Sequence, residues 1–360
     1  MSAVALGSSR PILEVTGLIK HFPVRAKGLF AGTTGRVHAV NGVSFSIAAG
    51  ETLALVGESG CGKTTAARTI ARLYRPDSGT VRFKGEDLAG LKGARLKSAR
   101  RAMQMVFQDP YGSLNPRLPV GVIIGEPLKI HGGRSRSQRR GRVEEVMAQV
   151  GLNPRDADRY PHQFSGGQRQ RIAIARALIL EPELIIADEP LSALDVSIQS
   201  QILNLLKDLQ EDRGLAFLFI THDLAVVDSF ADQVAVMYLG HIVEIAPRKA
   251  LFATPRHPYT RTLIDAVPVP GRGKRQPGTA ATGDVPNPAA PPSGCPFHTR
   301  CPRATARCRE AMPDLSADLS LGGVDGAHRF ACHHPLDVPG EDPGEDPGED
   351  TAVDAGGNGR

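Results

Sequence analysis

The sequence predicts an α/β fold built on a mostly parallel core sheet. Three runs, at Thr52–Val56, Leu184–Ala187 and Leu215–Ile220, are continuously apolar apart from Thr52, as strands buried on both faces are. Two earlier runs, Ile12–Leu18 and Val37–Ile47, alternate with a period of two and predict antiparallel strands. With 360 residues, of which 41% are apolar, the chain is long enough to bury a large core and to carry an additional module.

Two further elements complete this α/β plan. Between the first two buried strands lies an Arg-, Leu- and Gly-rich segment with a helical pattern at Val143–Val150. We expect an inserted helical subdomain there, at about 88–180. Beyond the last buried strand, Gln233–Ile245 alternates around Leu239 and Gly240, which predicts a hairpin.

These patterns divide the chain into four segments. We expect an N-terminal tail at 1–11, the main domain at 12–256, a cysteine-containing extension at 257–335 and an acidic tail at 336–360. Residues Val269–Ser293 have the Pro-, Gly- and Ala-rich composition of an extended linker. The tail repeats Gly-Glu-Asp-Pro and lacks the apolar area needed to order itself, so we expect it to be disordered.

Hydropathy and charge limit the location and the partners. No apolar run reaches the ~18 residues needed to cross a bilayer, and the first fifteen residues lack the features of a secretory signal. A cytoplasmic protein with reduced cysteines is expected. The net charge is +5, with basic runs at Arg95–Arg101 and Arg134–Arg142. These runs lack interleaved aromatic residues, which favours solvated helix faces over nucleic-acid binding.

A phosphate-binding loop follows the first buried strand. Gly57-Glu58-Ser59-Gly60-Cys61-Gly62-Lys63-Thr64 matches G-x-x-x-x-G-K-[ST] and precedes the helix-compatible stretch Thr65–Leu73. Glycines let backbone N–H groups converge on phosphates, Lys63 supplies a cation and Thr64 offers a hydroxyl to Mg²⁺. We expect the whole loop and Thr65 to bind ATP, with Cys61 as a small filler. The alternative, a chance glycine turn, is disfavoured by the strand–loop–helix context.

A pair of carboxylates ends the second buried strand. Asp188 and Glu189 follow Leu184–Ala187, an arrangement suited to holding Mg²⁺ with one acid and polarising water with the other. We assign the metal to Asp188 and the general base to Glu189. Acidic residues at a strand end are often only turn formers, but the upstream phosphate loop favours the catalytic interpretation.

A third motif precedes a predicted helix. Phe164 is followed by Ser165-Gly166-Gly167-Gln168 and then by a helix whose apolar residues share one face, so Ser165 is expected to cap it. Together with the other motifs, this sequence resembles the signature of ATP-binding-cassette proteins. The resemblance implies that two cassettes pair head to tail, so that Ser165–Gln168 close over the ATP held by the loop of the partner.

The resemblance extends to four further positions. Gln108 resembles the Q-loop glutamine, which implies a third Mg²⁺ contact beside Thr64 and Asp188. Ser192-Ala193-Leu194-Asp195 resembles the D-loop, and His222 the switch histidine that contacts the γ-phosphate and joins Glu189 and Lys63 as a catalytic residue. Phe22 resembles the adenine-stacking aromatic, with an ordinary core or edge phenylalanine as the alternative.

Longer stretches are similar to the ATPase subunits of bacterial oligopeptide and dipeptide importers. They are Val106–Arg117 (VFQDPYGSLNPR), Arg159–Arg171 (RYPHQFSGGQRQR) and His257–Thr262 (HPYTRT), within a resemblance running from Ile12 to Pro335. It implies an ATPase at the cytoplasmic face of the membrane that powers import. The implied partners are a second homologous cassette, in a heterodimer by family precedent, two permease subunits and an extracytoplasmic solute-binding protein. Gln108–Arg117 is the implied coupling segment, which touches the permease.

The extension carries Cys295, Cys301, Cys308 and Cys332, spaced C-x₅-C-x₆-C-x₂₃-C. In a cytoplasmic protein this quartet favours a metal site over disulfides. Members of the importer family carry such a quartet as iron–sulfur ligands, which implies a [4Fe–4S] cluster. Zinc and four reduced, buried thiols are alternatives, and His298, His328, His333 and His334 are competing ligands that we do not favour.

Other functions have weaker support. A soluble DNA- or ribosome-associated cassette ATPase would separate the loop from the signature by long coiled coils, or would repeat the cassette, and the sequence does neither. The His-Pro-Tyr stretch argues against an exporter. Nickel and other small solutes remain open as cargo beside peptides, because the residues that select the cargo lie in other subunits.

Overall fold

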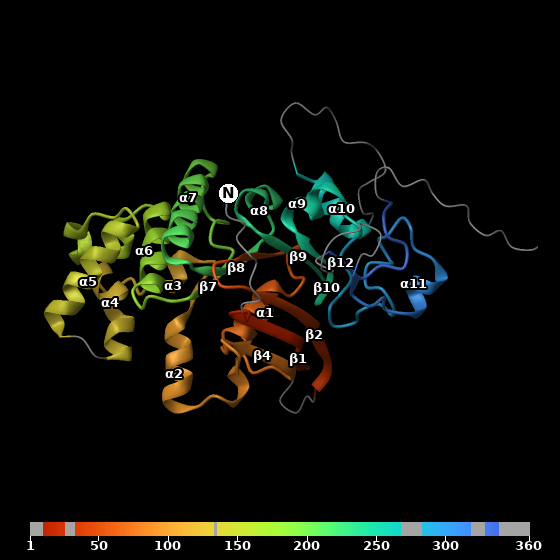
Figure 1. The fold of residues 1–360 in the computed structure, drawn as a ribbon, viewed down its shortest axis with the longest axis horizontal. Helices are drawn as coiled ribbons and strands as arrows, with labels where there is room; N and C mark the ends of the chain where they lie inside the picture. Colours follow the sequence, from red (N-terminus) through yellow and green to blue (C-terminus); the bar gives the residue numbers. More distant parts are fainter. Residues whose placement is uncertain (1–9, 26–32, 133–134, 268–282, 318–327, 338–360) are drawn as a thin grey trace, which may run out of the picture.

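The computed structural model describes residues 10–25, 33–132, 135–267, 283–317 and 328–337 (Figure 1). Most of the expected N-terminal tail, much of the Pro-rich linker and nearly all of the acidic tail lie outside these residues. The strands are β1 (Leu13–Arg25), β2 (Thr33–Ile47), β3 (Thr52–Val56), β4 (Ser78–Phe83), β5 (Glu86–Asp87), β6 (Met103–Val106), β7 (Leu184–Asp188), β8 (Ala216–Thr221), β9 (Gln233–Tyr238), β10 (His241–Pro247), β11 (Ser316–Ala317) and β12 (Arg329–Phe330). The helices are α1 (Lys63–Ile70), α2 (Gly93–Ala102), α3 (Pro110–Ser113), α4 (Val120–His131), α5 (Arg136–Gln149), α6 (Gly166–Leu178), α7 (Val196–Arg213), α8 (Leu224–Phe230), α9 (Arg248–Ala253), α10 (Pro258–Asp265) and α11 (Ala306–Glu310).

The larger sheet confirms the predicted α/β class. Within the described residues its order is β11-β12-β10-β9-β3-β8-β7-β6, and the five strands from β9 to β6 are mutually parallel. Every residue of β3, β7 and β8 is buried. Both faces of these strands are covered, which is why their sequences are apolar apart from Thr52, Asp188 and Thr221 at the strand ends.

Alternate residues of this sheet belong to different cores. Leu218 and Ile220 of β8 pack in a cluster with α1 and the antiparallel strands, whereas Phe217 and Phe219 pack in a cluster with α4 and α6. The antiparallel sheet has the order β2-β1-β4-β5 and lies below the core sheet in Figure 1. The predicted antiparallel strands at Ile12–Leu18 and Val37–Ile47 are confirmed as parts of β1 and β2.

Helices α3 to α6 form the group at the left of Figure 1, within the range expected for a helical subdomain. One element departs from that expectation: β6 lies inside about 88–180 yet joins the core sheet, with Met103 opposite Leu184 of β7. Its burial pattern has two half-buried residues between two buried ones, and it is the edge strand. A strand of this length with a mixed pattern carries little sequence signal.

The predicted hairpin is confirmed as β9 and β10, which pair antiparallel through a turn at Leu239 and Gly240, both with positive φ. Strand β12 extends the sheet beyond β10 and thereby attaches the cysteine-bearing segment to the core. No helix in the described ranges is both long and apolar enough to span a bilayer.

Candidate functional site

The loop between β3 and α1 is tightly enclosed by the backbone of two other strands. Gly57 has φ 151° and Gly62 has φ 109°. A Cβ at Gly57 would lie 2.2 Å from the carbonyl oxygen of Met237, and one at Gly62 would lie 2.0 Å from that of Ala39. Only glycine fits these positions. The loop delivers the chain to the start of α1, where the first-turn N–H groups lack helical partners and attract anions.

Two side chains fill the inside of this loop. Lys63 is 4% exposed, and its Nζ donates hydrogen bonds to the carbonyl oxygens of Gly57 (2.7 Å) and Glu58 (2.9 Å). Cys61 is 2% exposed, and burial raises the pKa of its thiol. A buried, protonated thiol is a poor nucleophile, which supports the filler role expected for Cys61.

Asp188 lies directly beside the loop. The Thr64 hydroxyl donates to Asp188 Oδ1 at 2.8 Å, while Oδ2 has no hydrogen-bond partner among the described residues. Asp188 is fully buried, which raises the pKa of its carboxyl, although the Thr64 hydrogen bond and the charge of Arg68 oppose that rise. An unpartnered buried carboxylate oxygen next to a loop hydroxyl fits an oxygen-liganded cation such as Mg²⁺.

Glu189 is held by residues that follow the two neighbouring strands. Gln108, after β6, donates from Nε2 to Glu189 Oε2 at 2.9 Å, and His222 Nδ1, after β8, lies 3.4 Å from Oε1. The carboxyl ends of parallel strands meet at one edge of the sheet, which brings these three residues together. Glu189 adopts φ 45°, a left-handed conformation rare for its residue type and found at functional sites.

Gln108 therefore contacts the expected base, whereas Thr64 and Asp188 contact each other. The first residue of the D-loop-like segment reaches the same place, since Ser192 Oγ donates to the Glu189 carbonyl oxygen at 3.1 Å. Phe22 lies edge-to-face against Tyr74 with ring centroids 5.3 Å apart, and Lys20 Nζ lies 5.3 Å from the Phe22 centroid. These contacts do not distinguish an adenine-stacking role for Phe22 from that of an ordinary core or edge phenylalanine, so both stay predictions.

Ser165 caps α6, as expected. Its Oγ accepts from the N–H of Gln168 (3.3 Å), and the Gln168 side chain accepts from the N–H of Ser165 (3.0 Å). A Cβ at Gly167 would lie 2.5 Å from Cγ2 of Ile198, so this helix start packs closely on α7. Within the described residues, no hydrogen bond or ion pair joins Ser165–Gln168 to the loop at Gly57–Thr64.

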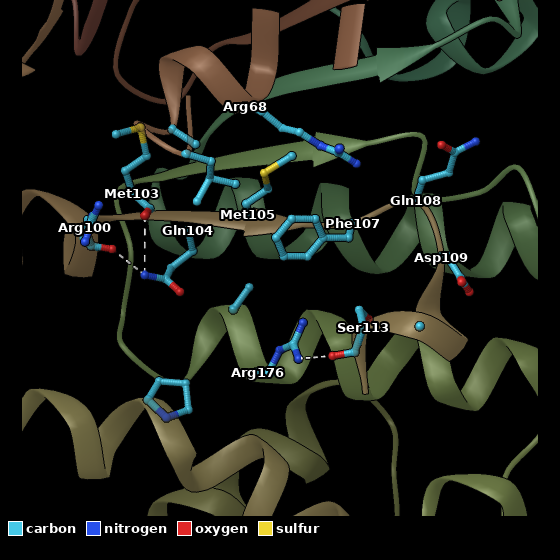
Figure 2. A pocket seen from close by; sticks show the side chains of 15 residues that line it. Arg68, Arg100, Met103, Gln104, Met105, Phe107, Gln108, Asp109, Ser113 and Arg176 are labelled. Atoms are coloured by element: carbon cyan, nitrogen blue, oxygen red, sulfur yellow. Dashed lines mark hydrogen bonds between the residues drawn. The ribbon is translucent and has the colours of Figure 1, made fainter. Parts of the chain in front are cut away.

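A groove opens beside Gln108 (Figure 2). Arg176 of α6 reaches across it to donate to the carbonyl oxygen of Ser113, and Phe107 lies over its middle. Its lining residues come from β6 and the segment after it, and from α1, α2, α3, α4 and α6. The groove thus joins the segment containing Gln108 to the helical group.

Two contacts on the loop were not anticipated from the sequence. The Tyr259 hydroxyl accepts from the N–H of Glu58 at 2.9 Å, and the Arg300 guanidinium binds the Glu58 carboxylate at 2.7 and 3.1 Å. Tyr259 belongs to the His-Pro-Tyr stretch, which indicated a protein family but did not predict a contact with the loop. Nothing in the sequence pointed to Arg300, because it lies 242 positions from Glu58 in an arginine-rich segment.

The four cysteines of the extension line one small cavity. All four are free; Cys295 and Cys308 are buried, and Cys301 and Cys332 are half-buried. Burial raises the pKa of Cys295 to about 11 and that of Cys332 to about 12. In the described residues, no three His, Cys, Asp or Glu side chains converge on a single ion.

The four nearby histidines are hydrogen-bonded to other groups. His298 bonds the Cys295 carbonyl oxygen, His328 the carboxylate of Glu244, His333 the Ala311 carbonyl oxygen and His334 the hydroxyl of Thr305. Each of these four bonds occupies one ring nitrogen, as is also usual for metal-bound histidines, so cysteine ligation stays a prediction.

Comparison with known proteins agrees with this geometry. Residues 40–192 match the family model described as ABC transporter, and residues 243–308 match that of the oligopeptide/dipeptide transporter C-terminal region. The oligopeptide transport ATP-binding protein AppF of Bacillus subtilis (strain 168) is 52% identical over 326 residues, covering 89% of this chain and 97% of the relative. The di/tripeptide transport ATP-binding protein DppF of Pseudomonas aeruginosa (strain UCBPP-PA14) is 49% identical, covering 90% of this chain and 97% of the relative.

Solved structures agree as well. CbiO1 of Clostridium perfringens, described as part of an ABC transporter complex, superposes with a TM-score of 0.58 at 29% identity, covering 68% of this chain and 91% of its own. The dimeric cassette MJ0796, bound to ADP and phosphate, superposes with a TM-score of 0.57 at 30% identity, covering 66% of this chain and 98% of its own.

The fold and the site thus define an ATP-binding-cassette ATPase that binds and hydrolyses ATP. Within that class, the chain belongs to the family of ATP-binding subunits of oligopeptide and dipeptide ABC transporters.

Proposed function

We propose that this chain powers a bacterial importer of oligopeptides or dipeptides. The observation that carries the proposal is the joining of two parts in one chain: a nucleotide site and an extension matching the oligopeptide/dipeptide transporter region. We assign 12–256 to the nucleotide-binding domain and 257–335 to the extension. The names of the relatives, which specify oligopeptide and di/tripeptide transport, support peptides as the cargo.

The roles proposed for the loop residues rest on their motif and on the contacts of Thr64, Asp188 and Gln108. Lys63 and the N–H groups at the start of α1 hold the phosphates of ATP. Thr64 and Asp188 are placed to hold Mg²⁺, with Gln108 offering Oε1 because its Nε2 donates to Glu189. The ion neutralises charge on the phosphates when it is bound. Residues 57–65 together form the ATP-binding segment.

Glu189 is the residue proposed to activate water. Its carboxylate lies at the end of β7 between Gln108 and His222, and contacts from both sides fix its orientation. The His222 side chain is more than half exposed and lies near Glu189, which supports the proposal that it contacts the γ-phosphate. The base orients and polarises the attacking water, and His222 links the state of the phosphate to the position of the base.

The signature residues Ser165–Gln168 are proposed to contact the ATP of a partner. They form a capped helix start that attracts anions but makes no described polar contact with the loop of the same chain. A second, homologous cassette would bring its own loop to this helix start and receive this chain's loop in return. We propose a heterodimer in which each composite site takes one half from this chain.

The groove beside Gln108 is the surface of this chain proposed to contact the permease, which comprises two transmembrane subunits. It connects Gln108, which contacts Glu189, with α3 and α6, so a displacement of the groove reaches the catalytic base through one hydrogen bond (Figure 2). Gln108–Arg117 is the coupling segment. The chain would then lie at the cytoplasmic face of the membrane, opposite an extracytoplasmic solute-binding protein.

The cysteine cavity is proposed to hold a [4Fe–4S] cluster, with zinc as the alternative. Four thiols lining one cavity supply the donor set of such a cluster. Zinc takes the same thiolate donors, so iron and sulfide content distinguishes the two. Bound metal would also stabilise the thiolates, which burial disfavours.

Glu189→Gln tests the catalytic assignment. The substitution preserves shape but removes the basic carboxylate, so MgATP should bind with nearly unchanged affinity while turnover falls by about 10²–10⁴. Hydrolysis is measured on the assembled transporter in proteoliposomes, with and without peptide-loaded binding protein. Exposed Glu211→Gln is the matched control and should retain full activity. Wild-type turnover in Glu189→Gln would show that Glu189 is not the base. A wild-type hydrolysis rate that peptide-loaded binding protein does not change would contradict peptide as the cargo.

A further inference from the structure

Glu58, the second residue of the phosphate loop, is held by three different groups. Its N–H donates to the Tyr259 hydroxyl at 2.9 Å, and its carbonyl oxygen accepts from Lys63 Nζ at 2.9 Å. Its carboxylate receives a two-pronged contact from Arg300, at 2.7 and 3.1 Å. Two of these three groups belong to the C-terminal extension, so the extension reaches the loop directly.

The His-Pro-Tyr stretch builds the first of these contacts. The His257 side chain caps α10 by accepting from the N–H of Tyr259 at 3.0 Å, and Pro258 occupies the first helical position, where it costs no hydrogen bond. Tyr259 is fully buried and packs edge-to-face on Tyr238, with centroids 4.7 Å apart. Its hydroxyl is thereby fixed at the backbone of Glu58.

The cysteine-bearing segment builds the second contact. Arg300 lies in the turn between Cys295 and Cys301, where its N–H donates to the carbonyl oxygen of Phe297 at 2.9 Å. Its guanidinium carbon is 6.0 Å from the ring centroid of Phe297. The Arg300 side chain is 9% exposed, so the contact with Glu58 is largely shielded from solvent. Shielding and two-pronged geometry distinguish it from an ordinary surface ion pair.

We propose that Tyr259 and Arg300 are positioning residues of the ATP site, which hold the phosphate loop in its nucleotide-ready form. They bind Glu58 at the start of the loop and leave the N–H groups at the start of α1 available to phosphates. A loop that samples other conformations binds more weakly, in proportion to the fraction of molecules in the competent form. The extension is thus a part of the nucleotide site as well as a module attached to it. This inference rests on the proposed assignment of Gly57–Thr64 as the phosphate-binding loop.

The four-cysteine cavity borders the same turn. Cys295 and Cys301 begin and end the turn that presents Arg300, and the N–H of Cys295 donates to the carbonyl oxygen of Cys308 at 2.8 Å. The position of Arg300 therefore depends on how these cysteines are held. Loss of the cysteine arrangement should weaken nucleotide binding through Arg300, without any cysteine touching the nucleotide.

The test is nucleotide affinity of the full-length chain, titrated with a fluorescent ATP analogue in the presence of Mg²⁺. Arg300→Ala should weaken binding about tenfold, as expected for loss of a largely shielded charge-assisted pair. Arg300→Lys, which keeps the charge but loses the two-pronged contact, should give an intermediate value. Arg303→Ala, in the same segment but bound to Pro335 and Asp337, is the matched control and should bind as the wild type does.

Two further variants separate positioning from simple attachment of the extension. Tyr259→Phe keeps the ring packing and should also weaken binding, and its folding is checked by thermal unfolding. Glu58→Gln combined with Arg300→Ala should cost no more than Arg300→Ala alone, because both remove the same contact. Wild-type affinity in folded Arg300→Ala and Tyr259→Phe would overturn the inference. Lys63→Ala tests the loop itself: retained binding there would overturn the loop assignment, whereas lost binding there with unchanged Arg300→Ala would overturn only the inference.

Discussion

Gly62→Ala is expected to damage both the fold and the ATP site. Gly62 has φ 109°, where a side chain costs about 1–2 kcal/mol, and its new Cβ would lie 2.0 Å from the carbonyl oxygen of Ala39. Contacts of this kind are essentially never below 3.0 Å, so the loop and β2 must separate by about 1 Å. Adding an overpacking cost of about 1–3 kcal/mol gives a total of about 2–5 kcal/mol.

Gly60→Ala supplies the matched control for this effect. Gly60 lies in the same loop with φ 80°, but nothing lies within 4 Å of the position of its Cβ. Gly60→Ala should therefore incur only the conformational cost of about 1–2 kcal/mol. Both variants are compared by urea denaturation and by affinity for MgATP. If Gly62→Ala proved no less stable than Gly60→Ala, the close approach of the loop to β2 would not be a property of the protein.

Two further predictions concern the extension. His328→Ala should destabilise the chain by about 1.5–3 kcal/mol, because it removes the 2.7 Å hydrogen bond to the fully buried carboxylate of Glu244. Its melting temperature should fall below that of the wild type. The exposed control His162→Ala should keep the wild-type melting temperature. An anaerobic preparation should contain iron and sulfide and should absorb visible light, and Cys295→Ser should lose all three properties together. One zinc per chain without iron would contradict the cluster and favour the zinc site.

Much of the fold could be predicted because its signals are local. The largely apolar runs that form most of β3, β7 and β8 can be recognised from the sequence alone, since burial on both faces leaves few polar positions. The cap at Ser165 is equally local, because the hydrogen bonds that form it span three residues. Strand β6 was not separated from the helical range, because its four residues have a mixed pattern at the edge of the sheet.

The residues of the candidate site were predictable from local sequence motifs, whereas their contacts with one another were not. The sequence alone predicted which residues offer phosphate, metal and base chemistry, because Lys63, Thr64, Asp188 and Glu189 stand in motifs whose spacing is set by a single turn or strand end. Only the tertiary structure decided how they meet: that Thr64 binds Asp188, and that Glu189 lies between Gln108 and His222.

The contacts of Tyr259 and Arg300 with Glu58 depend entirely on the tertiary structure. They join residues 201 and 242 positions apart, and they exist because the hairpin, the helix cap at His257 and the turn after Cys295 bring the extension back onto the loop. No local pattern encodes such a distance, since it results from the sum of many packing choices. The sequence identified an ATPase with an extension, and the tertiary structure placed that extension on the phosphate loop.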